Sequence, residues 1–165
     1  WYNSNLSGYA SKIATGGGAT FCNDRQPSTD SSSMNGSGGT GKTVTYYAAY
    51  IRLITNKAPT FKCATTSDRF ATSVGLITAD EVVYAGGVFE ANNSGYYLYT
   101  GQYYWAMSPC IASSDGYANV FYVYLSGDLS SNWTFGKAST RPVINLKSDV
   151  ALTGTGTASD PYVVS

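Results

Sequence analysis

Histidine is absent from this 165-residue chain, and charged residues make up only 12% of it. The absence of imidazole excludes histidine-based catalytic triads and imidazole-ligated metal sites. Ten acidic residues balance ten basic ones, so the composition gives no sign of a nucleic acid or an anionic membrane as a partner. No apolar run approaches the roughly 20 residues that a membrane-spanning helix needs.

Cysteine is also scarce, with three residues in the whole chain. Their wide spacing excludes a Cys-x-x-Cys motif and a zinc knuckle, and in an oxidising environment it leaves one disulfide and one thiol. We predict a Cys22–Cys63 disulfide, because each of these residues follows a segment with an aromatic side chain and opens a polar loop. Closing that loop would stabilise the fold by about 4 kcal/mol. Cys110, between Pro109 and Ile111, is predicted to be a buried thiol.

Glycine, serine, threonine and above all tyrosine are abundant, and the chain contains 15 tyrosines and 18 glycines. A neutral, tyrosine-rich and lysine-poor composition is typical of a β-rich extracellular protein. The length suffices to bury a core, so we interpret residues 1–165 as a single extracellular domain. The chain begins at Trp1 without a methionine or a signal peptide, and we expect a mature or trimmed product.

The densest aromatic stretch lies between Gly95 and Pro109, with five tyrosines and one tryptophan. Its pattern predicts two strands, Tyr97–Tyr99 and Tyr103–Met107, joined by a turn at residues 100–102. Because successive side chains of a strand point to opposite faces, some of these rings must be buried and others exposed.

Short helices and many short strands are expected elsewhere. A helix is predicted at Ser4–Thr15, and a second at Ala79–Ala85, where a capping box at residues 78–81 begins it and Gly86 ends it. The segment Thr43–Leu53 fits either a strand or a helix. Extended segments or strands are predicted at Ala19–Cys22, Pro59–Cys63, Val74–Ile77, Asn119–Leu125, Trp133–Phe135, Pro142–Leu146 and Tyr162–Val164. This order indicates an α+β domain, interrupted by a long polar loop at residues 23–43.

Two motifs suggest chemistry that their context does not support. Residues 36–43 match the phosphate-binding loop pattern, but no buried strand precedes them. Asp80, Glu81 and Glu90 offer paired carboxylates for glycoside hydrolysis, but helix capping and the helix dipole explain the first two. We therefore expect no enzyme and no catalytic residue.

Calcium is the one cofactor that stays open, since several loop carboxylates could supply oxygen ligands. Their spacing matches no calcium loop, and aspartate in a loop is usually a turn residue. We therefore predict no metal ligand among them; the loop carboxylates are Asp24, Asp30, Asp68, Asp115 and Asp128.

A family resemblance rests on several motifs in a fixed order. These are Val74-Gly-Leu-Ile-Thr-Ala-Asp-Glu-Val-Val-Tyr-Ala-Gly86, Tyr104-Trp-Ala-Met-Ser-Pro109, Arg141-Pro-Val-Ile-Asn-Leu-Lys147, Gly154-Thr-Gly-Thr157 and Asp160-Pro-Tyr-Val-Val164. Together with Phe21-Cys-Asn-Asp-Arg25 and Phe61-Lys-Cys63 they cover most of the chain. The set resembles the C-terminal part of a class of surface and pilin-like proteins of Gram-positive bacteria.

The resemblance implies a C-type-lectin-like fold and a non-enzymatic role in adhesion or filament building at the cell surface. The implied partners are further copies of the chain or other surface subunits. In this class the lectin-like module begins upstream of such a Trp-Tyr segment. The chain is therefore expected to lack its first strands or to receive them from a neighbouring subunit, at a sheet edge that another chain can fill.

The alternative is a monomeric lectin-like module that binds glycans or host proteins. Its apolar contacts would come from exposed rings and its hydrogen bonds from the polar loop. The candidate residues are Tyr96, Tyr99, Tyr103, Tyr104, Trp105, Asn23 and Asp24. A structural role is expected for Arg141, which we predict to pair with Asp80 or Glu81.

Overall fold

A computed structural model describes residues 4, 6–15, 19–27, 44–63, 65–113, 116–157 and 159–165. The Trp1-Tyr2 segment, the phosphate-loop match and residues 28–43 of the predicted polar loop lie outside these residues. None of the helices within the described ranges is long and apolar enough to cross a membrane.

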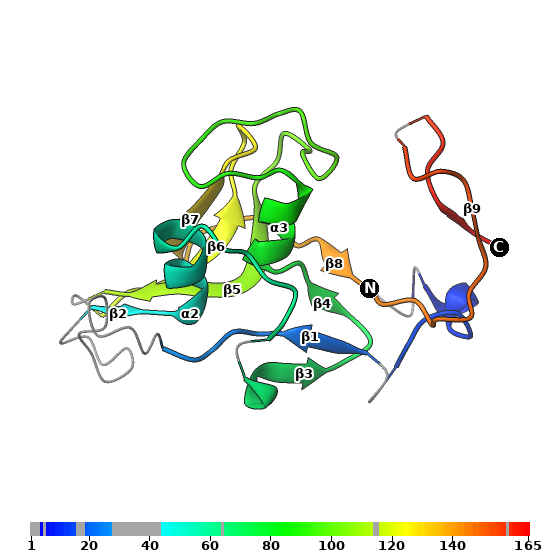
Figure 1. The fold of residues 1–165 in the computed structure, drawn as a ribbon, viewed down its shortest axis with the longest axis horizontal. Helices are drawn as coiled ribbons and strands as arrows, with labels where there is room; N and C mark the ends of the chain where they lie inside the picture. Colours follow the sequence, from blue (N-terminus) through cyan, green and yellow to red (C-terminus); the bar gives the residue numbers. More distant parts are fainter. Residues whose placement is uncertain are drawn as a thin grey trace.

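A four-stranded antiparallel sheet in the order β2–β5–β6–β7 forms the centre of the fold (Figure 1). Its strands are β2 (Thr45–Tyr46), β5 (Tyr104–Ala112), β6 (Ala118–Val123) and β7 (Leu129–Trp133). The predicted central strand Asn119–Leu125 is confirmed as β6, which pairs with β5 on one side and β7 on the other. Apolar side chains on both of its faces suit a strand with neighbours on each side.

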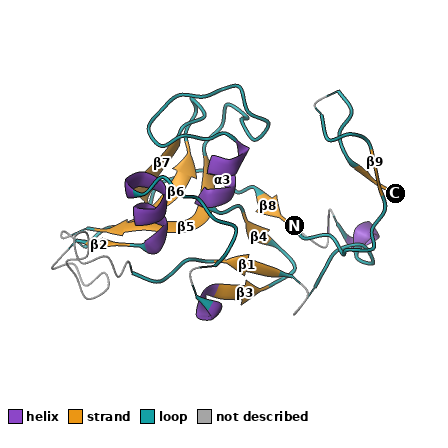
Figure 2. Cartoon of the chain, viewed as in Figure 1, coloured by secondary structure: helices purple, strands orange, loops and turns teal. Residues whose placement is uncertain are grey.

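The core lies on one face of this sheet, under two short helical segments (Figure 2). One is α2 (Ala48–Tyr50), which continues into the π-helical turn η3 (Ile51–Thr55), and the other is α3 (Ala79–Ala85). Every second side chain of β5 is buried from Tyr104 to Ala112, as alternation in a strand requires. The buried Ser108 hydroxyl accepts a hydrogen bond of 3.0 Å from the Ala79 amide, which ties α3 to the sheet.

Helix α3 confirms the predicted bounds, because its start and stop signals are local. The Thr78 hydroxyl accepts a hydrogen bond from the Glu81 amide, and the Glu81 carboxylate accepts one from the Thr78 amide. Gly86 ends the helix in the left-handed region at φ 116°.

Three two-stranded antiparallel sheets surround the centre: β1 (Thr20–Cys22) with β3 (Arg69–Ala71), β4 (Gly75–Leu76) with β8 (Pro142–Val143), and β9 (Leu152–Thr153) with β10 (Val163–Val164). A short 3₁₀ turn, η4 (Thr66–Asp68), precedes β3. The β9 strand lies apart from the main sheet, beside the N-terminal segment (Figure 1). A bridge between Ile13 and Leu146 connects that segment to the C-terminal part of the chain. Few short helices on mostly antiparallel sheets make an α+β domain, as predicted.

Three local predictions are corrected by the structure. Within the described residues 6–15, the helix expected at Ser4–Thr15 is limited to the 3₁₀ turn η1 (Ser7–Tyr9), because Ile13 forms a bridge with Leu146 instead. Residues 97–99 lie in a turn and an irregular segment rather than a strand, and residues 59–63 form an irregular segment with a bend at 61–62. The ambiguous segment Thr43–Leu53 contains both alternatives, since β2 leads directly into α2 and η3.

Candidate functional site

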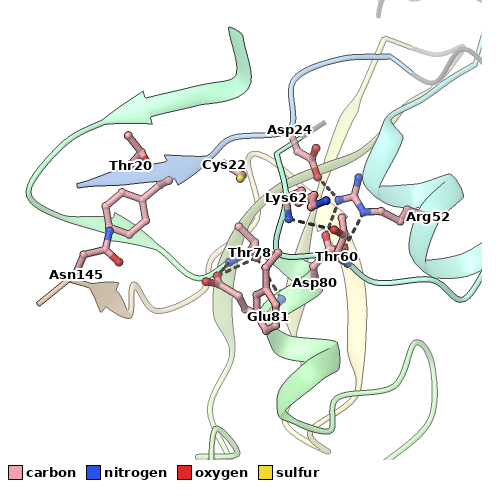
Figure 3. Close-up of a pocket in the computed structure, with 12 residues that line it drawn as sticks. Thr20, Cys22, Asp24, Arg52, Thr60, Lys62, Thr78, Asp80, Glu81 and Asn145 are labelled. Carbon is pink, nitrogen blue, oxygen red and sulfur yellow. Dashed lines mark hydrogen bonds and ion pairs between the residues drawn. The ribbon is translucent and has the colours of Figure 1, made fainter. Parts of the chain in front are cut away.

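A small polar cavity of about 90 Å³ lies where β1, η3 and α3 meet (Figure 3). At its centre Arg52 binds two carboxylates that come from distant parts of the chain. Its Nε donates to Asp80 Oδ1 at 2.7 Å, and its Nη2 donates to Asp80 Oδ2 at 2.5 Å and to Asp24 Oδ2. Thr60 adds a backbone amide to Asp80 Oδ1 at 2.8 Å. The three charged side chains form a buried ion network, with both carboxylates directed at one guanidinium.

The pKa values of this network follow from burial and hydrogen bonding. Burial raises the pKa of Asp24, and the hydrogen bond from Arg52 opposes that rise without cancelling it. For Arg52, burial lowers the pKa, but the hydrogen bonds from its guanidinium to Asp80 and Asp24 outweigh burial and raise it. Asp24 Oδ1 is buried and has no hydrogen-bond partner among the described residues, so Asp24 is the less stabilised of the two carboxylates.

The Cys22–Cys63 disulfide, predicted from the sequence, stands beside this cavity. It joins the end of β1 to the segment of residues 60–62, which leads into Cys63, and both segments line the cavity. The disulfide therefore holds together the two stretches of chain that carry Asp24 and Thr60. Cys110 is a buried free thiol, also as predicted.

The predicted partner of Arg141 is wrong. The Arg141 guanidinium donates to the Leu98 carbonyl at 2.6 Å and lies 4.7 Å from the centroid of the Tyr104 ring. Asp80 binds Arg52 instead, and Glu81 caps α3. The need for an arginine beside Asp80 could be inferred from the sequence. Its identity could not, because Arg52 reaches the site only through the packing of η3.

Two of the predicted ligand-binding rings are core residues. Tyr96 and Tyr104 are buried, and their hydroxyls donate to the Gly127 carbonyl at 2.9 Å and the Leu98 carbonyl at 3.2 Å. Tyr99 is half-buried and packs against the core. Tyr96 and Tyr104 therefore serve the core and are not available to a ligand.

The other predicted residues do not gather at one place. Tyr103 and Trp105 are half-buried and contact Tyr122, with ring centroids 6.0 Å and 5.8 Å away. Trp105 alternates with the buried Tyr104, so it faces away from the core side of β5. The buried Asp24 belongs to the ion network, and the amide of Asn23 donates to the Asp68 carbonyl at 3.0 Å. No common binding surface joins the two groups within the described residues.

A different aromatic group is exposed and was not singled out by the sequence. Tyr117, Trp133 and Phe135, here named the ring cluster, lie in mutual contact where β6 begins and β7 ends. The register explains the contact, because Trp133 is paired with Asn119, two residues after Tyr117. The alternation Trp133-Thr-Phe135 after a turn hinted at exposed rings, but only the strand pairing brings Tyr117 beside them.

An apolar groove of about 650 Å³ is the second surface that sequence reasoning missed. It lies where β3, β4 and β8 meet the middle of β5, and its lining residues are Phe70, Val74, Gly75, Leu76, Met107, Thr140 and Pro142. Phe70 is 50% exposed at its rim.

The chain matches no protein-family model, no curated protein and no solved structure. Within the described residues no group of three acidic or cysteine side chains is placed to hold a metal ion. The geometry of the surface therefore carries the functional argument.

Proposed function

We propose that the chain is a non-enzymatic extracellular subunit of a cell surface, structural and adhesive in role, pilin-like, and built on a C-type-lectin-like domain. The observation that carries the proposal is the apolar groove between the short peripheral strands and β5. Monomeric proteins rarely expose contiguous apolar surface of this kind, and where they do it usually marks an interaction site.

The walls of the groove suit a segment from a neighbouring copy. β3 and β4 each belong to a two-stranded sheet in the described part of the chain, so their remaining edges can accept a further strand. Gly75 lets β4 pack directly on the Phe21 ring, because a Cβ there would lie 2.6 Å from that ring. The groove thus combines apolar contact area with short strands at the edges of their sheets.

Two further features support an extracellular location. The Cys22–Cys63 disulfide is typical of proteins in oxidising compartments, and the low charge and high tyrosine content of the chain agree with that environment. The alternative is a monomeric module that binds glycans or host proteins.

Sedimentation velocity of the purified chain over a wide concentration range tests the subunit role. We expect reversible self-association that Phe70→Asp weakens about tenfold or more, because the substitution places a charge at the rim of the groove. Tyr97→Asp is the matched control, since Tyr97 is 82% exposed and does not line the groove.

Electron microscopy of the native cell surface, with antibody raised against this chain, tests the filament role directly. Labelled filaments with a regular repeat are expected. Diffuse surface label, together with a monomer at every concentration in solution, would refute the subunit role and leave the monomeric alternative.

A further inference from the structure

The ring cluster of Tyr117, Trp133 and Phe135 is an exposed aromatic surface that contributes little to the core. The three side chains are 46%, 47% and 63% exposed, although each contacts the other two. Trp133 and Phe135 stack with ring centroids 5.2 Å apart and planes 22° apart. Tyr117 lies 5.7 Å from Trp133 and 5.4 Å from Phe135. From this arrangement we infer that the ring cluster is a binding site for the sugar rings of a neutral oligosaccharide.

The cluster is held in place by the backbone that carries it. The Thr134 amide donates to the Ala118 carbonyl at 2.9 Å, and the Gly136 amide donates to the Trp133 carbonyl at 2.8 Å. The Ser113 hydroxyl donates to the Tyr117 carbonyl at 2.9 Å, which fixes the start of β6. A surface ordered before binding loses little conformational entropy when a ligand arrives, and this favours binding of a small, flexible molecule.

The turn after β7 contributes a second fixed element. The Trp133 amide donates to its neighbour's side chain, Asn132 Oδ1, at 2.8 Å. A Cβ at Gly136 would lie 2.9 Å from Asn132 Nδ2, so the glycine lets this side chain pack against the turn. The turn that carries Trp133 and Phe135 is therefore fixed by hydrogen bonds of its own backbone and of Asn132.

The chemistry of the rings distinguishes a sugar from other ligands. Aromatic faces bind the C–H-bearing face of a sugar ring, while the Trp133 indole N–H supplies a polar contact at the rim. A single-stranded nucleic acid also stacks on aromatic rings, but it needs a positively charged groove, and this chain has no net charge. A stable protein partner needs about 800 Å² from each side, far more than three rings present.

This inference does not depend on self-association through the apolar groove. The ring cluster lies at the end of β5 where Ala112 pairs with Ala118, whereas the groove contacts Met107 in the middle of that strand. A subunit and a monomeric module could each carry such a site. The two proposals therefore need separate variants and separate measurements.

Calorimetric titration with the neutral hexasaccharides of glucose, mannose, xylose and N-acetylglucosamine tests the site on the complete chain. We expect at least one of them to bind at millimolar concentration or below. Trp133→Ala and Phe135→Ala should each weaken that binding about tenfold or more, and Trp133→Phe should restore most of it by keeping an aromatic face. Tryptophan fluorescence should change on binding in the wild type, and the change should shrink in Trp133→Phe.

Phe61→Ala is the matched control, because Phe61 is also exposed and also stacks on another ring, that of Tyr84. It should leave the affinity within twofold of the wild type. The inference is overturned if none of the four hexasaccharides binds, or if the control weakens binding as much as the ring-cluster variants. Neither result bears on the self-association that Phe70→Asp is expected to weaken. The two proposals can therefore fail separately.

Discussion

Arg52 neutralises two buried carboxylates at once, and few single residues affect this fold more. Taking one partner away from a buried charge pair leaves an uncompensated charge, and this is more damaging than the net value of the pair suggests. Both Asp24 and Asp80 would lose their cation in Arg52→Ala. We expect the free energy of unfolding to fall by about 3–5 kcal/mol in urea titrations. The control Arg69→Ala, at an exposed position, should change it by less than about 0.5 kcal/mol.

Asp24 should make stability depend on pH in a direction opposite to that of an ordinary paired carboxylate. Its pKa in the folded protein is raised above 3.8 by burial, so the folded state keeps the proton after the unfolded chain has released it. The contribution of Asp24 is therefore fully present below pH 3.8 and is lost as the pH rises through the folded pKa. Unfolding titrations from acid to neutral pH should show this loss in the wild type and a flatter profile in Asp24→Asn. An equally steep loss in Asp24→Asn would assign it to another group.

At the scale of single residues, the sequence could predict that Asp80 is buried and paired, since it stands at the first turn of a well-capped helix. It could not select Arg52 over Arg141, because ion-pair partners depend on how η3 and the C-terminal strands pack. The same limit explains Tyr96 and Tyr104. Their rings were candidates for a ligand site, but their hydroxyls find carbonyl partners within the fold.

At the scale of elements, local signals were sufficient for α3 and for β6, but not for the first helix or the 97–99 strand. A capping box and a terminal glycine act within one turn, so they can be identified in the sequence. Residues 6–15 have the spacing of a helix, but pairing of Ile13 with Leu146 outweighs a short helix that is marginal alone. The loop that contains residues 97–99 follows tertiary contacts with the β6–β7 turn, and these have no signature in the sequence.

Gly127 is the residue that lets this loop approach the β6–β7 turn. It has φ 82°, and a Cβ there would lie 1.9 Å from the Asn93 carbonyl oxygen. Gly116 has a similar φ of 89°, but nothing lies within 4 Å of a Cβ built there. An alanine at Gly116 therefore measures the cost of the backbone conformation without a steric clash. Gly116→Ala should lower the free energy of unfolding by about 1–2 kcal/mol. Gly127→Ala should lower it by about 1–3 kcal/mol more, because the loop must move to make room.

Thermal unfolding of the two alanine variants, each against the wild type, measures the difference. Equal losses would show that the loop yields to the extra methyl group without strain. In that case the close approach at Gly127 would reflect backbone conformation alone.

At the scale of the whole molecule, the order of the expected elements predicted the α+β class, and the segments that flank Cys22 and Cys63 predicted the disulfide. Neither surface that now carries a proposal was predicted. The ring cluster depends on the register of β6 against β7, and the groove on four strands from distant parts of the chain. Register and sheet order are long-range properties. Counting aromatic residues along the chain therefore directed attention to the Gly95–Pro109 stretch, where half of the six rings serve the core.

The disulfide gives the whole molecule its clearest prediction. It joins residues 41 positions apart, and in the chain-entropy model its loss destabilises the fold by about 4 kcal/mol. Cys63→Ser should show that loss in urea titrations, and reductant should reproduce it in the wild type but leave the variant unchanged.

Burial raises the pKa of the Cys110 thiol to about 12, although a hydrogen bond with Ser131 opposes the rise. A thiol reagent at pH 8 should therefore find no reactive thiol in the folded wild type and one per chain after unfolding. Three thiols per chain in denaturant, without reductant, would show that the disulfide is not formed, and the extracellular assignment would lose its main support.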